Sequence, residues 1–393
     1  MTAHSSPPRW VLLSALALVA FNLRSVLTSI SPEILSIQGD THWSDVTMGT
    51  LTMLPVLLMG VFALAVPAIA AHLGRRRTVW LAMLVLTVAM AMRLAALVPG
   101  VLHLSVLLGG IGIAMAAGLV PGIVREQMPD AIGAVTGLWT ASMFAGAALA
   151  AGLTVPIATA LGSWQDALAV WAIPAAIAWV LWTIVERPFA EAIPAGAGGL
   201  RLGSLPWRNR TAWALTIYMT VNSIVFYSTV AWTAASYEDR GWSPAASGAL
   251  FAVSAAGQVL AALILPWVAH RFRALRTLLV ITTLLSVVML LLIGFAPAFS
   301  PVLVLTVFGF VHSGGFAVSL SLLSSYSSDA SASARLTAMA YFVTYIIAAL
   351  GPLASGLILQ ATHSWPAVFA FLALVMVAQL PTILPLRRGI TIA

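Results

Sequence analysis

The sequence has no cysteine and no lysine, and only 7% of its 393 residues are charged. The missing cysteine excludes disulfide bonds, thiolate metal sites and cysteine nucleophiles. Soluble domains carry about 25% charged residues, so the low charge excludes an ordinary soluble protein. The hydrophobic share of 61% excludes a disordered chain. The net charge of +7 comes without a basic stripe, which argues against nucleic-acid binding. The composition indicates an integral membrane protein.

Long apolar runs divide the chain into twelve segments of the length that a transmembrane helix needs, about 20 residues. They cover residues 10–31, 47–71, 78–98, 101–124, 133–160, 164–185, 211–236, 243–269, 275–296, 299–325, 335–360 and 364–386. We therefore predict an all-α integral membrane protein with twelve transmembrane helices. The first run lacks a small-residue cleavage site, so we expect a retained helix and not a signal peptide.

The arginines predict the orientation. With the N-terminus inside the cell, fifteen of the 18 arginines fall on the cytoplasmic side, as the positive-inside rule requires. Arg93 is expected near the outer end of the third helix, and Arg24 is the one arginine expected well inside a span. Both termini are expected in the cytoplasm. The predicted outer loops hold Arg240 and six acidic residues: Glu33, Asp40, Asp45, Asp166, Glu238 and Asp239.

The two halves of the chain resemble each other at an offset near 199 residues. The matching positions are Trp43-Ser44 with Trp242-Ser243, Gly49 with Gly248, and Ser163-Trp164 with Ser364-Trp365, the last at an offset of 201. We predict an N-terminal six-helix bundle (1–186), a Pro- and Gly-rich cytoplasmic linker (187–210) and a C-terminal six-helix bundle (211–393). Two parallel six-helix repeats resemble the major facilitator superfamily, whose substrate site lies at the midplane between the halves.

Arg24 is the strongest candidate for a binding residue. A charged side chain inside the hydrocarbon core costs about 2.5–3.5 kcal/mol and usually faces a cavity or a partner. Asn22 and Thr28 share a polar arc with Arg24 on a helical wheel, and no acidic residue is expected in the middle of a span. Three interpretations stay open: Arg24 binds an anionic or dipolar substrate, extends to the outer headgroups, or makes structural hydrogen bonds.

Other side chains in the predicted spans are weaker candidates for a cavity wall, and packing inside a bundle is the alternative for each. They are Trp139 and Ser142 on one face of the fifth segment, Tyr218 and Asn222 on one face of the seventh, and Tyr341 in the eleventh. The G-x-x-x-G spacings at Gly118–Gly122 and Gly133–Gly137 predict close helix contacts.

His312, in the tenth segment, titrates near neutral pH and is a candidate proton relay. The alternative is a histidine bonded to a neighbouring helix. The superfamily's loop motif between the second and third helices, G-x-x-x-D-[RK]-x-G-R-R, matches here at Gly74, Arg75 and Arg76. Ala71 replaces its acidic residue, so this segment is either a cytoplasmic gating loop or a set of topology anchors. No nucleotide, metal or hydrolase motif is present, and we expect no cofactor and no metal.

Several segments resemble the bacterial cyanate transporter family (CynX/NimT) of the major facilitator superfamily. Residues 21–29 (FNLRSVLTS) resemble its N-[LM]-R-x-x-L-T-S stretch, residues 51–55 (LTMLP) its L-T-x-L-P segment, and residues 136–141 (TGLWTA) its M-G-L-W-S-A segment. The resemblance implies that Arg24, Asn22, Trp139 and Asn222 line the substrate cavity. Arg24 would hold an anion or nitro group, and Trp139 would be a flat stacking wall.

The resemblance implies a transporter, secondary active or facilitative, for a small anionic or planar polar solute such as cyanate or 2-nitroimidazole. It implies alternating access by rocking of the halves. We also expect no enzymatic activity, and a monomer in the bacterial inner membrane. The alternative is a multidrug/proton antiporter, a class that usually carries a membrane-embedded acid, which is missing here. A non-transporting membrane sensor would need a signalling domain, and the longest polar segment is only a linker.

Overall fold

The computed structural model describes residues 9–128, 131–186, 202–272, 274–328, 330–387 and 389–392. The predicted linker therefore lies outside the described residues up to position 201. The longer helices are α1 (Arg9–Thr28), α2 (Ile34–Thr41), α3 (Asp45–Leu73), α4 (Arg75–Ala91), α5 (Val101–Gln127), α6 (Ile132–Leu161), α7 (Trp164–Val170), α8 (Ala172–Glu186), α9 (Arg210–Glu238), α10 (Pro244–Arg271), α11 (Leu275–Phe295), α12 (Pro301–Ser325), α13 (Ala330–Ala348), α14 (Leu350–Thr362) and α15 (Trp365–Ala378). The short helix α16 (Leu380–Ile383) follows α15.

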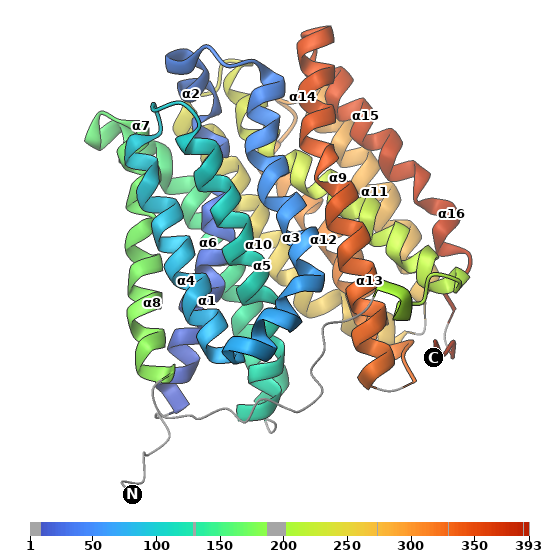
Figure 1. Ribbon diagram of the computed structural model, residues 1–393. Helices are drawn as coiled ribbons and strands as arrows, with labels where there is room; N and C mark the ends of the chain where they lie inside the picture. Colours follow the sequence, from blue (N-terminus) through green and yellow to red (C-terminus); the bar gives the residue numbers. More distant parts are fainter. Residues whose placement is uncertain are drawn as a thin grey trace, which may run out of the picture.

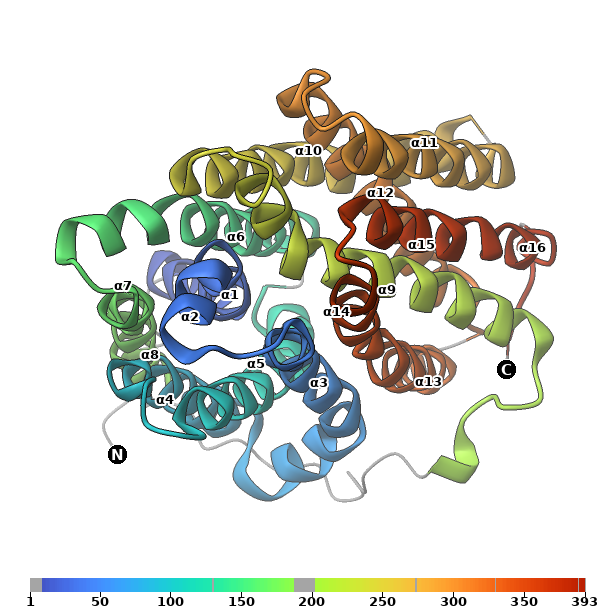
Figure 2. The ribbon, with the colours of Figure 1, turned by 90° about the horizontal axis from the view of Figure 1, so that it is seen from above.

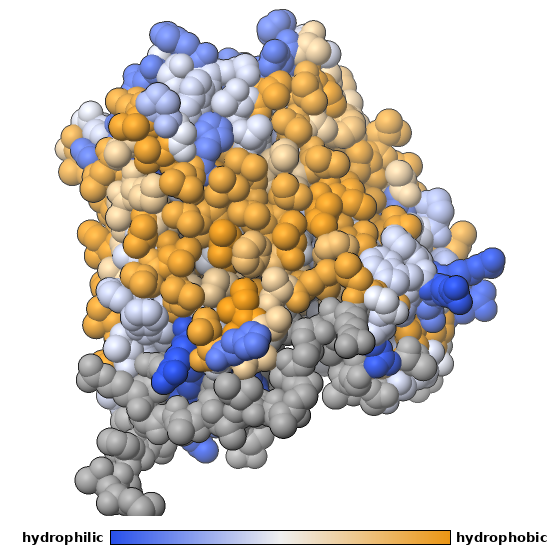
Figure 3. Space-filling view, viewed as in Figure 1, coloured by the Kyte–Doolittle hydropathy of each residue, from blue (hydrophilic) through white to orange (hydrophobic). Residues whose placement is uncertain are grey.

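In the part of the chain that the structure describes, these helices make twelve spans long and apolar enough to cross a membrane, which confirms the predicted fold class. They stand side by side in two groups, α1 to α8 and α9 to α16 (Figures 1 and 2). On the face seen in Figure 3, a wide apolar band lies between two polar ends. We refer to the end that carries α2 and α7, at the top of Figure 1, as the predicted outer end.

The internal repeat is visible in the hydrogen bonds at this end. The Trp164 indole donates to the Asp40 carboxylate (2.8 Å), and the Trp365 indole donates to the Asp239 carboxylate (2.7 Å). The two acids are 199 residues apart and the two tryptophans 201, so the offsets of the sequence match recur as equivalent bonds. The matched serines also cap helices in the same way: Ser44, Ser163, Ser243 and Ser364 each accept a bond from the main chain of the helix that follows.

The two groups meet along α3 and α6 on one side and α10, α13 and α14 on the other. At the predicted outer half of this interface the backbones are so close that a Cβ at Gly49 would lie 2.9 Å from the Pro352 carbonyl oxygen. A Cβ at Gly248 would lie 2.5 Å from the Ala151 carbonyl oxygen, which is the equivalent contact by the repeat. Ser31 also donates a bond across the interface to the Ala231 carbonyl (3.1 Å). The halves are therefore in direct contact at this end.

The first span is longer than predicted. It continues beyond residue 31 through a 3-10 turn (Ser31–Glu33) and α2. Pro32 is the second residue of this turn, where its missing N–H costs nothing. The turn packs against α6, α9 and α10. Glu33, predicted for an outer loop, is therefore only 2% exposed. That expectation was wrong, because helices of the second bundle cover the turn that carries Glu33. The sequence around Pro32 and Glu33 does not show this packing.

Candidate functional site

Arg24 reaches from the first bundle to the second. It lies on α1, and its guanidinium carbon is 4.8 Å from the centre of the Phe226 ring and 6.0 Å from that of Tyr227, both on α9. A guanidinium over an aromatic face at this distance makes a cation–π interaction. The side chain is half-buried, so it sits where the two bundles meet and not at a lipid headgroup.

The Arg24 guanidinium is incompletely satisfied. Its Nε is buried and has no hydrogen-bond partner, although the Tyr227 hydroxyl is close to the group. No carboxylate in the described part of the chain forms an ion pair with it. Buried donors are rarely left unpaired in proteins, so the vacant Nε and the uncompensated charge suit an anionic or strongly dipolar ligand.

Aromatic rings from α9 and α13 surround this charge. Phe226 and Tyr227 meet edge to face with ring centres 5.2 Å apart. Tyr345 lies 6.3 Å from Tyr227 and 5.4 Å from Tyr341. Tyr341, a predicted site residue, is thus brought into the cluster through Tyr345. We call Phe226, Tyr227, Tyr341 and Tyr345 the aromatic cluster.

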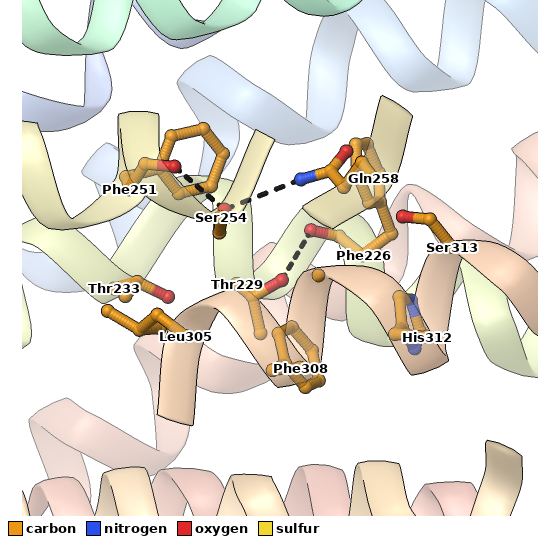
Figure 4. A pocket seen from close by; sticks show the side chains of 11 residues that line it. Phe226, Thr229, Thr233, Phe251, Ser254, Gln258, Leu305, Phe308, His312 and Ser313 are labelled. Atoms are coloured by element: carbon orange, nitrogen blue, oxygen red, sulfur yellow. Dashed lines mark hydrogen bonds between the residues drawn. The ribbon is translucent and has the colours of Figure 1, made fainter. Parts of the chain in front are cut away.

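A narrow cavity of about 10 Å³, partly lined by Phe226, lies between α9, α10 and α12 (Figure 4), with room for about one water molecule. His312 is 3% exposed there, stacks on Phe308 at 5.0 Å and faces Phe226 at 6.5 Å. Its Nδ1 has no partner. The cavity is lined by Phe226, Thr229, Thr233, Phe251, Ser254, Gln258, Leu305, Phe308, Gly309, His312 and Ser313.

Two residues that the helical wheel grouped with Arg24 make other contacts. The Asn22 amide donates to the Leu18 carbonyl (2.7 Å) and to the Pro174 carbonyl of α8 (3.2 Å), inside the first bundle. The Thr28 hydroxyl donates to the Arg24 carbonyl of its own helix. The structure therefore does not bring Asn22 or Thr28 to the vacant Arg24 Nε.

Trp139 and Ser142 lie on α6, toward the opposite end from Arg24. Gly146 of α6 is in contact with Phe21 of α1. Trp139 precedes Gly146 by seven residues and Arg24 follows Phe21 by three. Because these helices run in parallel at 1.5 Å per residue, Trp139 and Arg24 are about 15 Å apart along the bundle. Ser142 lies one turn from Gly146 on the same side as Trp139.

Asn222 and Tyr218 point into the second bundle. The Asn222 amide donates to the Gln379 side chain (2.8 Å), which in turn donates to the Thr283 hydroxyl (2.6 Å). The Tyr218 hydroxyl faces Gly315 of α12, beside Thr282. These contacts join α9 to the helices behind it, as polar residues do within membrane bundles.

The predicted loop Gly74, Arg75 and Arg76 is a one-residue turn between α3 and α4. Gly74 has φ 85° and ψ 147°, a conformation that a side chain would strain. Arg76 is buried, and its carbonyl accepts a bond from the Trp182 indole (2.9 Å). The turn thereby fixes α4 to α8.

Phe226, Tyr227 and Tyr345 were not predicted as site residues. Phe226 carries no polar signal, and Tyr227 lies off the predicted polar face of its helix. The one available signal is the spacing of Tyr341 and Tyr345, which places both rings on one helix face. Among the described residues, no three His, Asp or Glu side chains lie close enough to hold a metal ion.

A family model described as Major Facilitator Superfamily matches residues 12–237 and 224–388. Curated relatives include an uncharacterized transporter, YycB, of Bacillus subtilis (30% identity over 93% of this chain and 91% of the relative). The cyanate transport protein CynX of Escherichia coli is 30% identical (93% and 94% covered), and a 2-nitroimidazole transporter of Escherichia coli is 28% identical (93% and 92% covered). The crystal structure of the nucleoside transporter NupG has the same fold, with a TM-score of 0.74 at 14% identity (95% and 97% covered).

Proposed function

Because the chain belongs to the Major Facilitator Superfamily and is a transport protein and not an enzyme, we propose that it moves a small anionic or planar polar solute across the membrane by alternating access. Relatives named for cyanate and for 2-nitroimidazole support this class of solute. In the proposed mechanism the two bundles rock against each other around a site at their interface.

The observation that carries the proposal is the vacant Arg24 Nε beside the aromatic cluster. In the proposed site Arg24 binds the anionic or nitro end of the solute through its planar donors. The aromatic cluster excludes water and supplies flat surfaces for a planar solute. Asn22, Thr28, Tyr218 and Asn222 are then supports of the bundles and not solute ligands.

His312 is the proposed proton site of the transporter. Its imidazole faces the same Phe226 ring that Arg24 contacts, and its Nδ1 is vacant. A proton on His312 together with an anion at Arg24 leaves the pair of sites with the same total charge as the empty protein. We further propose that the end carrying the turn at Arg75–Arg77 is cytoplasmic, in a bacterial inner membrane.

Uptake of labelled cyanate into proteoliposomes tests the proposal. We expect saturable uptake, competition by 2-nitroimidazole and by nitrate, and a loss of at least tenfold in Arg24→Ala. Arg208→Gln, an exposed arginine far from the site, is the matched control. A pH-sensitive dye inside the vesicles reports whether protons enter with the solute and whether His312→Gln stops them. Full uptake by a folded Arg24→Ala protein would remove Arg24 from the site.

A further inference from the structure

The proposed function uses the cavity behind Phe226 only for the proton on His312. We propose that it is a second subsite, which takes the uncharged ring of a planar heterocyclic solute while Arg24 holds the anionic or nitro group of that solute. The inference rests on the proposed function, because it extends the Arg24 site.

Apart from His312, the polar side chains of the cavity are neutral and form hydrogen bonds. Gln258, Ser254 and Thr229 are all buried, and each of these groups both donates and accepts. The Gln258 amide reaches the Ser254 hydroxyl only weakly, at 3.4 Å, and the Ser254 and Thr229 hydroxyls bond to carbonyls of their own helices (Figure 4). Among the described residues, no acid or arginine lines the cavity, so the cavity suits the uncharged part of a solute.

His312 adds an independent sign of a ligand. It is 3% exposed, lines the cavity and has a vacant Nδ1, and a buried unpaired ring nitrogen costs free energy until something bonds to it. The ring lies parallel to Phe308 and Phe226. Donors and acceptors set between aromatic faces suit a heteroaromatic ring, whose edge forms hydrogen bonds and whose faces stack.

Phe226 borders both the subsite and Arg24. Its ring both contacts the guanidinium at 4.8 Å and lines the cavity. The cavity of about 10 Å³ is too small for a ring as it stands. A rotation of the half-buried Phe226 side chain joins the cavity to the Arg24 site and makes room. A small linear anion then uses Arg24 alone, whereas a planar heterocycle uses Arg24 and the subsite together.

Calorimetric titration of the purified protein with cyanate and with 2-nitroimidazole tests the subsite. We expect Gln258→Leu to raise the Kd for 2-nitroimidazole about tenfold or more, and the Kd for cyanate less than twofold. Thr229→Val is a second variant that removes a cavity hydroxyl with little change of shape. Ser286→Ala, a buried serine bonded within α11 and outside the cavity, is the matched control.

The outcomes separate this inference from the proposed function. If Arg24→Gln weakens both ligands while Gln258→Leu and Thr229→Val change neither, or change both equally, the subsite is overturned and the Arg24 site stands. If folded wild-type protein binds neither ligand, both proposals are overturned. A selective loss of 2-nitroimidazole in the two cavity variants, with Ser286→Ala unchanged, supports the subsite.

Discussion

Two arginines inside the spans have opposite environments. Arg93 lies near the outer end of its span, as expected, in the 3-10 turn (Met92–Ala95) that follows α4, and it is 0% exposed inside the first bundle. It donates to the Ser105 hydroxyl (3.1 Å), the Ser29 hydroxyl (2.9 Å) and the Val26 carbonyl (2.7 Å). All three nitrogens of its guanidinium are bonded, whereas Arg24 keeps a vacant Nε. Arg93 therefore joins the turn after α4 to α1 and α5, whereas the Arg24 Nε makes no such bond.

Replacing Arg93 tests this difference. We expect Arg93→Met to destabilise the protein by about 3 kcal/mol or more, because two hydroxyls and a carbonyl lose a charged donor, at roughly 1.5–3 kcal/mol each. Thermal unfolding in detergent, followed by tryptophan fluorescence, measures the change, with Arg208→Gln as the surface control. Unchanged stability would mean that these bonds add nothing to the fold.

At the residue scale the sequence predicts which side chains are unusual but not what they face. A helical wheel puts Arg24, Asn22 and Thr28 on one polar arc of α1, but in the structure Asn22 faces α8 and Arg24 faces α9. The wheel does not say which part of this polar arc faces α8 and which faces the other bundle. That choice depends on neighbours more than 150 residues away, such as Pro174 for Asn22 and Phe226 for Arg24.

At the scale of helices, packing depends on a few glycines. A Cβ at Gly110 of α5 would lie 2.5 Å from the Pro55 Cα of α3, and a Cβ at Gly309 of α12 would lie 2.2 Å from the Ser254 carbonyl oxygen of α10. Gly309 follows Gly110 by 199 residues, and Ser254 follows Pro55 by the same number, so the same helix crossing occurs in each bundle. The G-x-x-x-G spacing does not identify these contacts, since Gly137 has nothing within 4 Å.

Replacing a tightly packed glycine and an unpacked glycine by alanine should change the stability of the protein in opposite directions. We expect Gly110→Ala to cost about 1–3 kcal/mol, because the added methyl group forces α3 and α5 apart. Gly137→Ala is the matched helical control and should be neutral or stabilising by up to about 1 kcal/mol, because alanine favours a helix. The unfolding temperatures of the two variants test this prediction. If both variants are destabilised equally, the close approach of α3 and α5 at Gly110 is not the cause of the loss of stability.

At the scale of the whole molecule the sequence predicts the architecture well. Twelve apolar runs and an offset of 199 residues are enough for twelve spans in two repeats, because hydropathy and repetition are properties of the chain itself. The sequence does not predict the aromatic cluster or the cavity behind Phe226. Both form only where helices from distant parts of the chain meet, namely α1, α9, α10, α12 and α13. The sequence therefore predicts Arg24 and Tyr341 as site candidates, but it does not predict which side chains surround them.

The contact between the halves at the predicted outer end gives the test of alternating access. An ideal Cβ on Gly152 of α6 lies 3.4 Å from the Cβ of Ala252 on α10, close to the separation of about 3.5–4.5 Å in a disulfide. Because the chain has no cysteine, the double variant Gly152→Cys/Ala252→Cys introduces a single possible disulfide. We expect oxidation to stop uptake by holding the halves together, and reduction to restore it.

Each single cysteine variant is the control, because it carries the same substitution without the bond. Uptake should then be insensitive to the oxidant. Full uptake by the fully cross-linked double variant would contradict rocking of the halves at this interface. Equal losses in the single and double variants would trace the effect to the side chains. Only a loss that needs both cysteines and reverses with reductant shows that α6 and α10 must separate in the transport cycle.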